Sequence, residues 1–373
     1  MSNTLKFGAG KWATGTDTVL AYNDENSNFK PLPFDFTRAS TATVVNKLGL
    51  IEDVASGTPR IDFLGNTKGA LLLEPQRSNL ATYSEDFTQW SVVGSPIVSS
   101  NFGTSPDGTV NADRVQMETG DRLYQSVSTS NASFSIYAKS NDGLSHTVNM
   151  RDGSGIVNYN MVVTNTWQRF DVYLNTSMTN VQLRSYENNV DILIYGAQLE
   201  AGSYPTSLIN TSGTAVTRVA DTCSQTPPSG IIGQTEGTMF VEADLTHSAA
   251  SNQYLMQVRG DNPNRLFIYR EGGTNKLGCF ALIGAATIFT SLTAVATSGV
   301  VKVAFAYKSG DFAFYINGTQ IGTSSATFSI ATALTELFID QNNSVENGFY
   351  NYNQALLYDT RLTNAELATL TTL

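Results

Sequence analysis

The sequence has little of what metal-dependent or nucleophilic catalysis requires. Its 373 residues include two histidines and two cysteines. His146 and His247 lie far apart, and no GxSxG or HExxH motif accompanies them. Cys223 and Cys279 have neither CxxC spacing nor a neighbouring histidine, which argues against a zinc site. A disulfide between them is possible, but two free thiols are favoured for a chain made in a reducing cytoplasm. We therefore expect no cofactor, no metal ion, and no Ser-His or zinc chemistry.

Charge is also scarce, and basic charge most of all. Charged residues make up 14% of the chain, against about 25% in typical soluble proteins. Twenty-two basic residues face 32 acidic ones, for a net charge of −10. Without a Lys/Arg cluster we exclude nucleic acid as a partner, because contacts to phosphates supply most of the affinity of such complexes.

Long apolar segments are missing as well. No uninterrupted apolar run approaches the ~18 residues that predict a membrane-spanning helix. The first residues also lack the apolar stretch that is typical of a signal peptide. We expect no membrane insertion.

What the chain does contain is the alternation of apolar and polar residues that is typical of strands. Ser133–Lys139 and Gln168–Leu174 each place apolar side chains on one face, and Asp191–Ala197 is a nearly continuous apolar strand. Further strand patterns follow residue 236, where Asn317-Gly318 predicts a tight hairpin. A capping box from Thr363 to Glu366 predicts a short C-terminal helix.

The predicted fold class is all-β, with an extended N-terminal arm and small hairpins followed by two β-sandwich domains of jelly-roll type. The arm covers residues 1–80, where Phe7, Trp12 and a few other apolar residues are too sparse for a core. The sandwiches cover residues 81–222 and 236–373, and a linker at 223–235 contains Pro227 and Pro228. The arm could dock on its own chain, on a sister subunit or on a larger assembly. Leu71–Trp90 would join it to the first sandwich.

Motifs in a fixed order carry a family resemblance from Phe36 to Asp221. They are Phe36–Thr43, Gly49–Ile51, Pro59-Arg60, Leu72–Leu80, Tyr83–Phe87, Trp90, Pro106–Thr109, Ala112-Asp113, Trp167–Arg169, Gly196–Glu200, Pro205–Ser207, Thr217-Arg218 and Ala220-Asp221. Together they resemble a module of structural proteins from tailed bacteriophages, with a jelly roll of carbohydrate-binding-module type. Glu236–Leu373 is similar to concanavalin-A-like or laminin-G-like lectin sandwiches, on Phe314–Gly318 and Leu357–Thr363.

The resemblance implies a non-enzymatic virion protein, either a head fibre or capsid decoration or a tail fibre, assembled in the host cytoplasm. The expected partners are other virion proteins, bound through the arm, and host surface glycans, bound through the sandwiches. We expect a homo-oligomer, with a homotrimer as the specific prediction. A purely architectural spacer is an alternative role.

Sugar contact calls for exposed aromatic rings beside polar side chains. The candidates are Tyr124, Tyr137 and Tyr186 in the first sandwich and Arg265 and Tyr269 in the second. The competing interpretation is packing, because a tyrosine on a β face is commonly half-buried with a wet hydroxyl.

Two further readings concern carboxylates. Glu242 and Asp244 share one strand face about 7 Å apart, a spacing that could suit a glycosidase, so a capsule depolymerase on a lectin fold is the enzymatic alternative. The apolar residues around them predict instead that both acids face solvent. Through the resemblance, Glu85, Asp107 and Glu200 are candidates for a structural calcium ion. Pairing with Arg77, Arg114 or Arg218 is the favoured alternative for these three acids.

Overall fold

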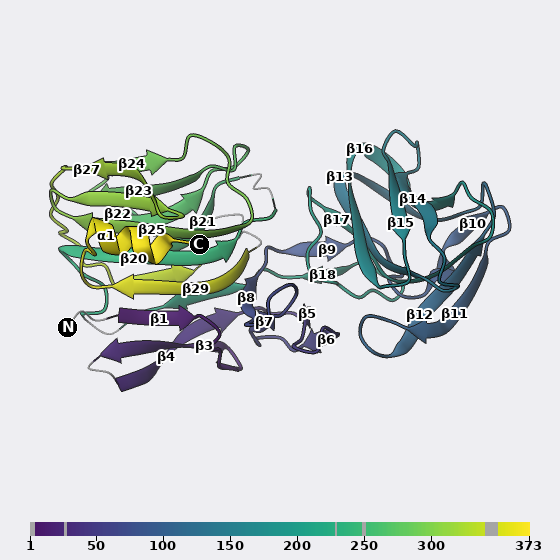
Figure 1. The fold of residues 1–373 in the computed structure, drawn as a ribbon, viewed down its shortest axis with the longest axis horizontal. Coiled ribbons are helices and arrows are strands. Elements are labelled where there is room, and N and C mark those ends of the chain that lie inside the picture. The colour runs from purple at the N-terminus through teal and green to yellow at the C-terminus, as the bar shows by residue number, and fades with distance from the viewer. Residues whose placement is uncertain (1–3, 26–27, 228–229, 248–250, 340–349) are drawn as a thin grey trace. The chain divides into compact units, whose positions relative to one another are not determined.

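A computed structural model describes residues 4–25, 28–227, 230–247, 251–339 and 350–373 (Figure 1). Its regular structure is almost entirely strand, which confirms the all-β class and the β-sandwich architecture. The chain divides into two compact units that are interleaved along the sequence. Unit 1 consists of Met1–Ala39, Val54–Pro75 and Ala220–Leu373, and unit 2 of Ser40–Asp53 and Gln76–Val219.

Unit 1 is a sandwich whose two layers enclose a large apolar core. One layer contains β20 between β25 and β29, and the other contains β21 between β22 and β28. Its elements are β1 (Thr4–Gly8), β2 (Thr14–Gly15), β3 (Thr18–Glu25), β4 (Asn28–Thr37), β7 (Arg60–Asp62), β8 (Ala70–Leu73), β19 (Thr222–Gln225), β20 (Glu236–Asp244), β21 (Gln253–Asp261), β22 (Asn264–Arg270), β23 (Leu277–Ile283), β24 (Ala286–Leu292), β25 (Val300–Lys308), β26 (Phe312–Ile316), β27 (Thr319–Ser324), β28 (Glu336–Ile339), β29 (Tyr350–Tyr358) and α1 (Asn364–Thr371).

Most residues of the predicted arm are strands of this sandwich, whereas residues 40–53 and 76–80 belong to unit 2, so the prediction of a separate segment at 1–80 is corrected. β1 pairs with β29, β3 pairs with β1 and β4, and β4 pairs with β19, which in turn pairs with β28. Through these pairings the strands join the edge of one layer to the edge of the other, and Figure 1 shows β1, β3 and β4 on the side of β29. Of the predicted alternatives, docking on its own chain is the one observed. Phe7, Val19 and Phe34 lie in the same core as Met239 and Leu357. The sparse apolar residues build no core of their own because they complete one formed by distant sequence.

The predicted linker at 223–235 is also part of unit 1. Thr222–Gln225 is strand β19, and Ile231 and Ile232 are buried in the core. Pro228, which helped to mark the linker, lies outside the described residues, whereas Pro227 lies within them.

Two local predictions in unit 1 are confirmed. Asn317 and Gly318 connect β26 to β27 with φ angles of 47° and 79°, the left-handed conformations that a tight hairpin requires. Helix α1 begins with the expected capping box, in which Thr363 accepts from the backbone N–H of Glu366 and the Glu366 carboxylate accepts from that of Thr363. Within the described residues, no helix has the length and apolar character needed to cross a membrane.

Unit 2 is a second sandwich, with long strands that run through both layers. β13 pairs with β16 along most of its length, with β10 at its start and with β17 at its end. Its elements are β5 (Ala42–Val45), β6 (Ile51–Val54), β9 (Arg77–Asn79), the 3-10 helix η1 (Phe87–Gln89), β10 (Ser91–Val93), β11 (Ile97–Thr104), β12 (Val110–Met117), β13 (Arg122–Ser140), β14 (His146–Asp152), β15 (Asn158–Val163), β16 (Gln168–Ser185), β17 (Val190–Ala201) and β18 (Val216–Arg218).

Asn79 shows why unit 2 begins before the predicted boundary at residue 81. Its side-chain amide donates to the carbonyls of Ala197 (3.0 Å) and Ile209 (2.9 Å). Its side-chain oxygen accepts from the backbone N–H groups of Ala81 (3.0 Å) and Leu199 (2.9 Å). A buried amide with all four of these bonds ties the entry of the chain to β17.

Charged residues of unit 1 form a buried network beside the points where the chain leaves and re-enters that unit. Arg60 contacts Glu74 and Asp221, each at 2.5 Å, and Arg38 contacts Asp221 at 3.2 Å. None of these four side chains is exposed. Burial lowers the pKa of Arg60, but Asp221 and Glu74 outweigh that effect and hold the pKa above its ordinary value. The segment Leu71–Trp90, which was predicted to join the arm to the first sandwich, therefore contributes Glu74 to a structural ion network.

Candidate functional site

One outer face of unit 2 is built from polar side chains on four neighbouring strands, β13, β16, β14 and β15 (Figure 1). Leu123, Leu183 and Met150 point from these strands into the core and are fully buried. Because successive side chains of a strand alternate between its faces, the residues between them point outward. We call this surface the polar face; its members are Arg122, Tyr124, Asn149, Arg151, Asn158, Asn160, Gln182, Arg184 and Tyr186.

Strand register aligns most of these side chains in two rows across the sheet. The first row consists of Arg122, Arg184, Asn149 and Asn160, and the second of Tyr124, Gln182, Arg151 and Asn158. Cross-strand neighbours on one face lie about 5 Å apart at Cβ. Donors and acceptors are therefore spaced at the scale of a single sugar ring.

Several polar atoms on this face are buried without a hydrogen-bond partner. The side-chain oxygens of Asn149 and Gln182 accept no hydrogen bond from the described residues, although the two residues are only 3% and 4% exposed. The Nε atoms of Arg122 and Arg184 are likewise buried and have no acceptor within the described chain. Leaving such a group unsatisfied costs about 1–3 kcal/mol. The Nε atoms of Arg77, Arg169 and Arg265 are in the same state elsewhere in the described chain, so unpaired atoms alone do not mark a binding surface.

Tyr186 is held in place at one end of the polar face. Its hydroxyl accepts a hydrogen bond from Arg151 Nη1 at 3.1 Å, and Arg184 Cζ lies 4.6 Å from the centroid of its ring. The residue nevertheless remains 49% exposed. A ring fixed by two guanidinium groups and still open to solvent can pack against the apolar side of a sugar.

The structure places Tyr124 and Tyr186 on the same face, at different positions along neighbouring strands, but not the third tyrosine predicted for this sandwich. Tyr137 lies on the second half of β13, opposite Tyr195 of β17. Their ring centroids are 6.2 Å apart, and Arg169 Cζ lies 5.4 Å from the centroid of the Tyr137 ring. Tyr137 is therefore in a different part of the sandwich, where packing accounts for its contacts.

Arg265 and Tyr269 lie together on β22 in unit 1, within a group of packed rings. Phe267 lies between them in sequence, and its ring centroid is 4.6 Å from Tyr254 and 5.2 Å from Phe280. The ring centroids of Phe267 and Tyr269 are 5.6 Å apart, and Arg265 Cζ also lies 5.6 Å from the Phe267 centroid. Burial raises the pKa of the Tyr269 hydroxyl. Because these rings pack chiefly on one another, we favour the polar face as the binding surface.

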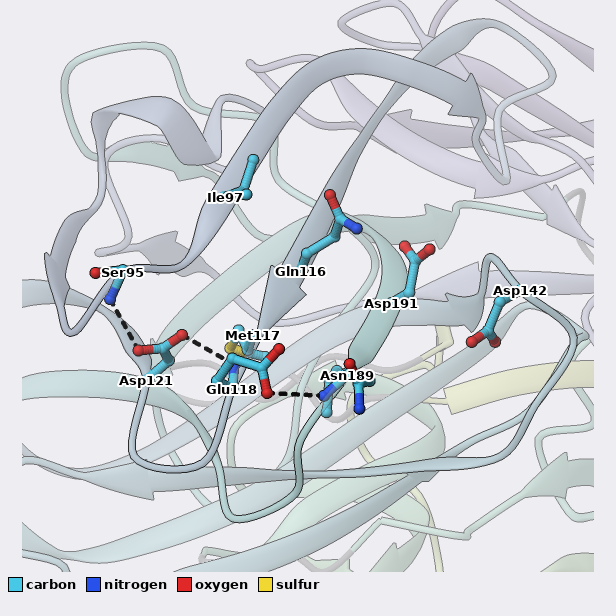
Figure 2. Close-up of a pocket in the computed structure, with 10 residues that line it drawn as sticks. Ser95, Ile97, Gln116, Met117, Glu118, Asp121, Asp142, Asn189 and Asp191 are labelled. Atoms are coloured by element: carbon cyan, nitrogen blue, oxygen red, sulfur yellow. Dashed lines mark hydrogen bonds between the residues drawn. The ribbon is translucent and has the colours of Figure 1, made fainter.

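Unit 2 also contains a pocket of about 300 Å³ that is lined by four carboxylates (Figure 2). Asp121 accepts from the backbone N–H groups of Ser95 (2.8 Å) and Glu118 (2.9 Å), and Glu118 accepts from that of Asn189 (3.1 Å). These bonds fasten three loops together, and no aromatic ring is among the lining residues. The pocket contains none of the predicted candidates.

The other two carboxylates of the pocket are also engaged. Arg114 binds both oxygens of Asp191, at 2.7 and 2.6 Å, and its hydrogen bond is the main reason that the Asp191 pKa is lowered. Burial alone would raise the pKa of Asp142, but hydrogen bonds from the Leu144 backbone and from the His146 and Ser140 side chains outweigh it and lower the pKa to about 2. Because the pKa values of Asp142 and Asp191 are lowered, these two groups keep their negative charge near neutral pH, and the pocket is poorly suited to an anionic ligand.

The acids considered for calcium are occupied within the protein. Glu200 accepts from Gln198 and Thr206, and Asp107 accepts from Thr109 and its neighbours. Arg114 pairs with Asp191 rather than with Glu85 or Asp107. Across the described ranges, no three His, Cys, Asp or Glu side chains gather in a way that could hold a metal ion.

The two carboxylates considered for glycoside hydrolysis face away from the core, as predicted. Val241, Ala243 and Leu245 are fully buried, while Glu242 and Asp244 are half-buried on the opposite face. Glu242 accepts hydrogen bonds from the side-chain amides of Asn353 (3.1 Å) and Gln354 (3.0 Å). Both carboxylate oxygens of Glu242 are therefore engaged in hydrogen bonds with neighbouring side chains on the sheet surface.

Most residues of the polar face were not among the predicted site residues. Asn149, Gln182 and Arg122 belong to short polar–apolar alternations such as Arg122-Leu-Tyr124 and Gln182-Leu-Arg184. Their outward positions could have been read from the apolar residues between them. What could not be read was that three such strands are neighbours.

No protein-family model matches the chain, and no curated protein matches its sequence. Among solved structures, the chain is similar to the CBM40 module of a Ruminococcus gnavus sialidase at 18% identity and a TM-score of 0.32, covering 37% of this chain and 84% of that one. It is similar to domain 4 of the arabinanase AbnA of Geobacillus stearothermophilus, in complex with arabinotriose, at 10% identity and a TM-score of 0.34, covering 46% and 84%.

A third likeness is to the CBM2 module of the evolved Dit of Lactobacillus casei BL23 phage J-1, at 10% identity and a TM-score of 0.27, covering 39% of this chain and 71% of that one. These structures are carbohydrate-binding modules or a domain with a bound oligosaccharide. At such TM-scores the likenesses do not bear on what this chain binds.

Proposed function

We propose that this chain is a non-enzymatic structural protein of a tailed-bacteriophage virion that adheres to host surface glycans through the polar face of unit 2. The virion setting comes from the motifs between Phe36 and Asp221. The adhesive role comes from the polar face, and one observation carries it. Tyr186 is 49% exposed, while Arg151 and Arg184 hold its ring in place.

Sugar hydroxyls match the chemistry of this surface. A hydroxyl can donate to the side-chain oxygen of Asn158, which is exposed, and can accept from a guanidinium of Arg122 or Arg184. Tyr186 adds an exposed ring beside these groups. The combination of a fixed ring with convergent donors and acceptors favours a saccharide over an apolar ligand.

A glycan array with the full-length protein tests the adhesive role. We expect binding to a restricted set of glycans, and a loss of at least tenfold in affinity for Tyr186→Ala. Tyr173→Ala is the matched control, because Tyr173 is also an exposed tyrosine of unit 2 and pairs with Ser133 on a different part of β13. It should bind as the unmodified protein does.

An array without any bound glycan would contradict the adhesive role and leave the chain as an architectural spacer. Equal losses for Tyr186→Ala and Tyr173→Ala would place binding elsewhere. Near-unchanged thermal melting of each variant ensures that a loss of binding is not a loss of folding.

The virion and the non-enzymatic parts of the proposal have their own tests. Mass spectrometry of purified particles should find the chain as a stoichiometric component, and its mass in solution should be that of a homotrimer. Incubation with the bound polysaccharide should leave the length of that polymer unchanged. Shortening of the polymer would instead support the depolymerase alternative.

A further inference from the structure

Two arginines of the polar face lie directly opposite each other on adjacent strands. Arg122 of β13 is paired with Arg184 of β16 in the antiparallel register. Like charges in directly opposite positions destabilise a sheet, because their Cβ atoms lie about 5 Å apart. Such a pair calls for a negative charge nearby.

The neighbouring strands supply no such charge. On one side Val93 of β10 lies opposite Arg122, and on the other Asn149 of β14 lies opposite Arg184. Neither arginine forms an ion pair or donates a hydrogen bond within the described part of the chain, and the contact shown by Arg184 is with the ring of Tyr186.

The two acids closest in sequence are committed elsewhere. Asp121 precedes Arg122, but its oxygens accept from the backbone of Ser95 and Glu118 in the acidic pocket (Figure 2). Glu187 follows the end of β16, and it accepts from the backbone N–H of Thr147 at 3.0 Å. The chain as a whole carries a net charge of −10, so an uncompensated arginine pair is a specific local feature of this face.

We infer that the glycan bound by the polar face carries an anionic group, a carboxylate or a sulfate, that docks between the guanidinium groups of Arg122 and Arg184. This inference rests on the proposed adhesive function. A planar guanidinium group can bind either a carboxylate or a sulfate through paired charge-assisted hydrogen bonds. The exposed ring of Tyr186, which Arg184 packs against, contacts the same saccharide. A neutral glycan covers this ring but leaves the two positive charges uncompensated.

The experiment compares matched oligosaccharides that differ only in the anionic group. The probes are galacturonate and galactose oligomers of equal length, and galactose oligomers with and without sulfate, presented to the full-length protein. The bound members should be anionic, with an affinity at least tenfold above that of the neutral counterpart and decreasing as sodium chloride is raised from 50 to 500 mM. The carboxylate and sulfate arms decide which group is recognised.

Variants assign the effect to the arginine pair. Arg122→Gln together with Arg184→Gln should lower the affinity for the anionic oligosaccharide at least tenfold and abolish its advantage over the neutral one. Arg169→Gln is the control, because Arg169 stacks on Tyr137 and donates to Ser135 in another part of the sandwich. It should leave both affinities unchanged.

The outcomes separate this inference from the proposed function. Preference for neutral glycans, with binding that still depends on Tyr186, would overturn the inference and retain the adhesive role. Anionic binding that survives the double substitution would also overturn it. Binding of no glycan at all would reject both.

A measurement without ligand gives an independent check. If the two guanidinium groups repel each other in the free protein, the double substitution to glutamine should raise the Tm, and added salt should raise the Tm of the unmodified protein more than that of the variant. A lower Tm for the variant would show that the fold already compensates the pair, which would overturn the inference.

Discussion

At the scale of single residues, unit 1 depends on an ion network that is closed to solvent. Arg60 lies between Glu74 and Asp221, and Arg38 contacts the second oxygen of Asp221. The backbone N–H of Glu74 also donates to Asp221 at 2.9 Å. Because Asp221 is shared by two arginines, its removal leaves positive charge buried without its main partner.

Asp221→Ala should therefore lower the free energy of unfolding of unit 1 by about 3–5 kcal/mol. Urea denaturation monitored by tryptophan fluorescence and circular dichroism measures the change. Lys308→Ala is the matched comparison, since Lys308 pairs with Glu236 at the surface and such pairs contribute about 0–1 kcal/mol. Similar effects of the two substitutions would contradict the role assigned to the network.

Asp142 provides a pH-dependent test at the same scale. Its pKa in the folded protein is about 2, below the ordinary value of 3.8, because its hydrogen bonds outweigh burial. A lowered folded pKa contributes stability that is fully present above the unfolded value and is lost as the pH falls through the folded one. The Tm difference between the unmodified protein and Asp142→Asn should be constant above pH 5 and shrink between pH 4 and pH 2.

Asp171→Asn serves as the control for that series. Asp171 is exposed on β16 and accepts no hydrogen bond from the described residues. Its Tm difference from the unmodified protein should show little of the decrease seen for Asp142. A flat profile for Asp142→Asn would mean that its hydrogen bonds do not persist in solution.

At the scale of elements, strands β1, β3 and β4 close one side of the unit 1 sandwich. Phe34 of β4 is fully buried, and its ring centroid lies 4.8 Å from that of Phe7 on β1. Both rings share a core with residues more than 200 positions further along the chain, Met239 and Leu357 among them. The N-terminal strands are thus a structural requirement of the C-terminal sandwich.

Phe34→Ala should cost about 3–5 kcal/mol, because it removes a large buried side chain and leaves a cavity. Chemical denaturation measures the loss, and Leu64→Ala in the same unit is the control. Leu64 is 65% exposed, so its truncation should change the free energy of unfolding by no more than about 0.5 kcal/mol. Equal stabilities would show that the N-terminal strands do not share the core.

At the scale of the whole molecule, the two units are interleaved rather than consecutive. Unit 1 takes three separate segments of the chain and unit 2 takes two. The division expected from the sequence, with a self-sufficient sandwich at 236–373, omits the partners of two of its strands. β29 pairs with β1 and β8, and β28 pairs with β19.

Residues 236–373 produced alone should fail to fold cooperatively. The exposed edges of β28 and β29 and the open core predict aggregation, which size-exclusion chromatography and near-ultraviolet circular dichroism can detect. The full-length chain, treated identically, is the reference and should elute as a folded species. A cooperative thermal transition in the fragment would falsify the interleaved division.

The sequence alone determined the all-β class, the strand patterns of β13, β16 and β17, the hairpin at Asn317 and the cap of α1. Each of these features depends on residues that are close together in the sequence. It also indicated Tyr124 and Tyr186, because an aromatic residue in an alternating strand is visible without knowing its neighbours. The sequence did not distinguish these two tyrosines from Tyr137, because all three lie in the same local pattern.

Only the tertiary structure decided which distant segments pair. The sequence does not state that β1 lies beside β29, nor that Arg122 lies opposite Arg184 with Asn149 on the next strand. Strand register is set by packing across the whole sheet, whereas alternation is set within a few residues. The N-terminal arm therefore became part of a core, and three scattered polar alternations became one face.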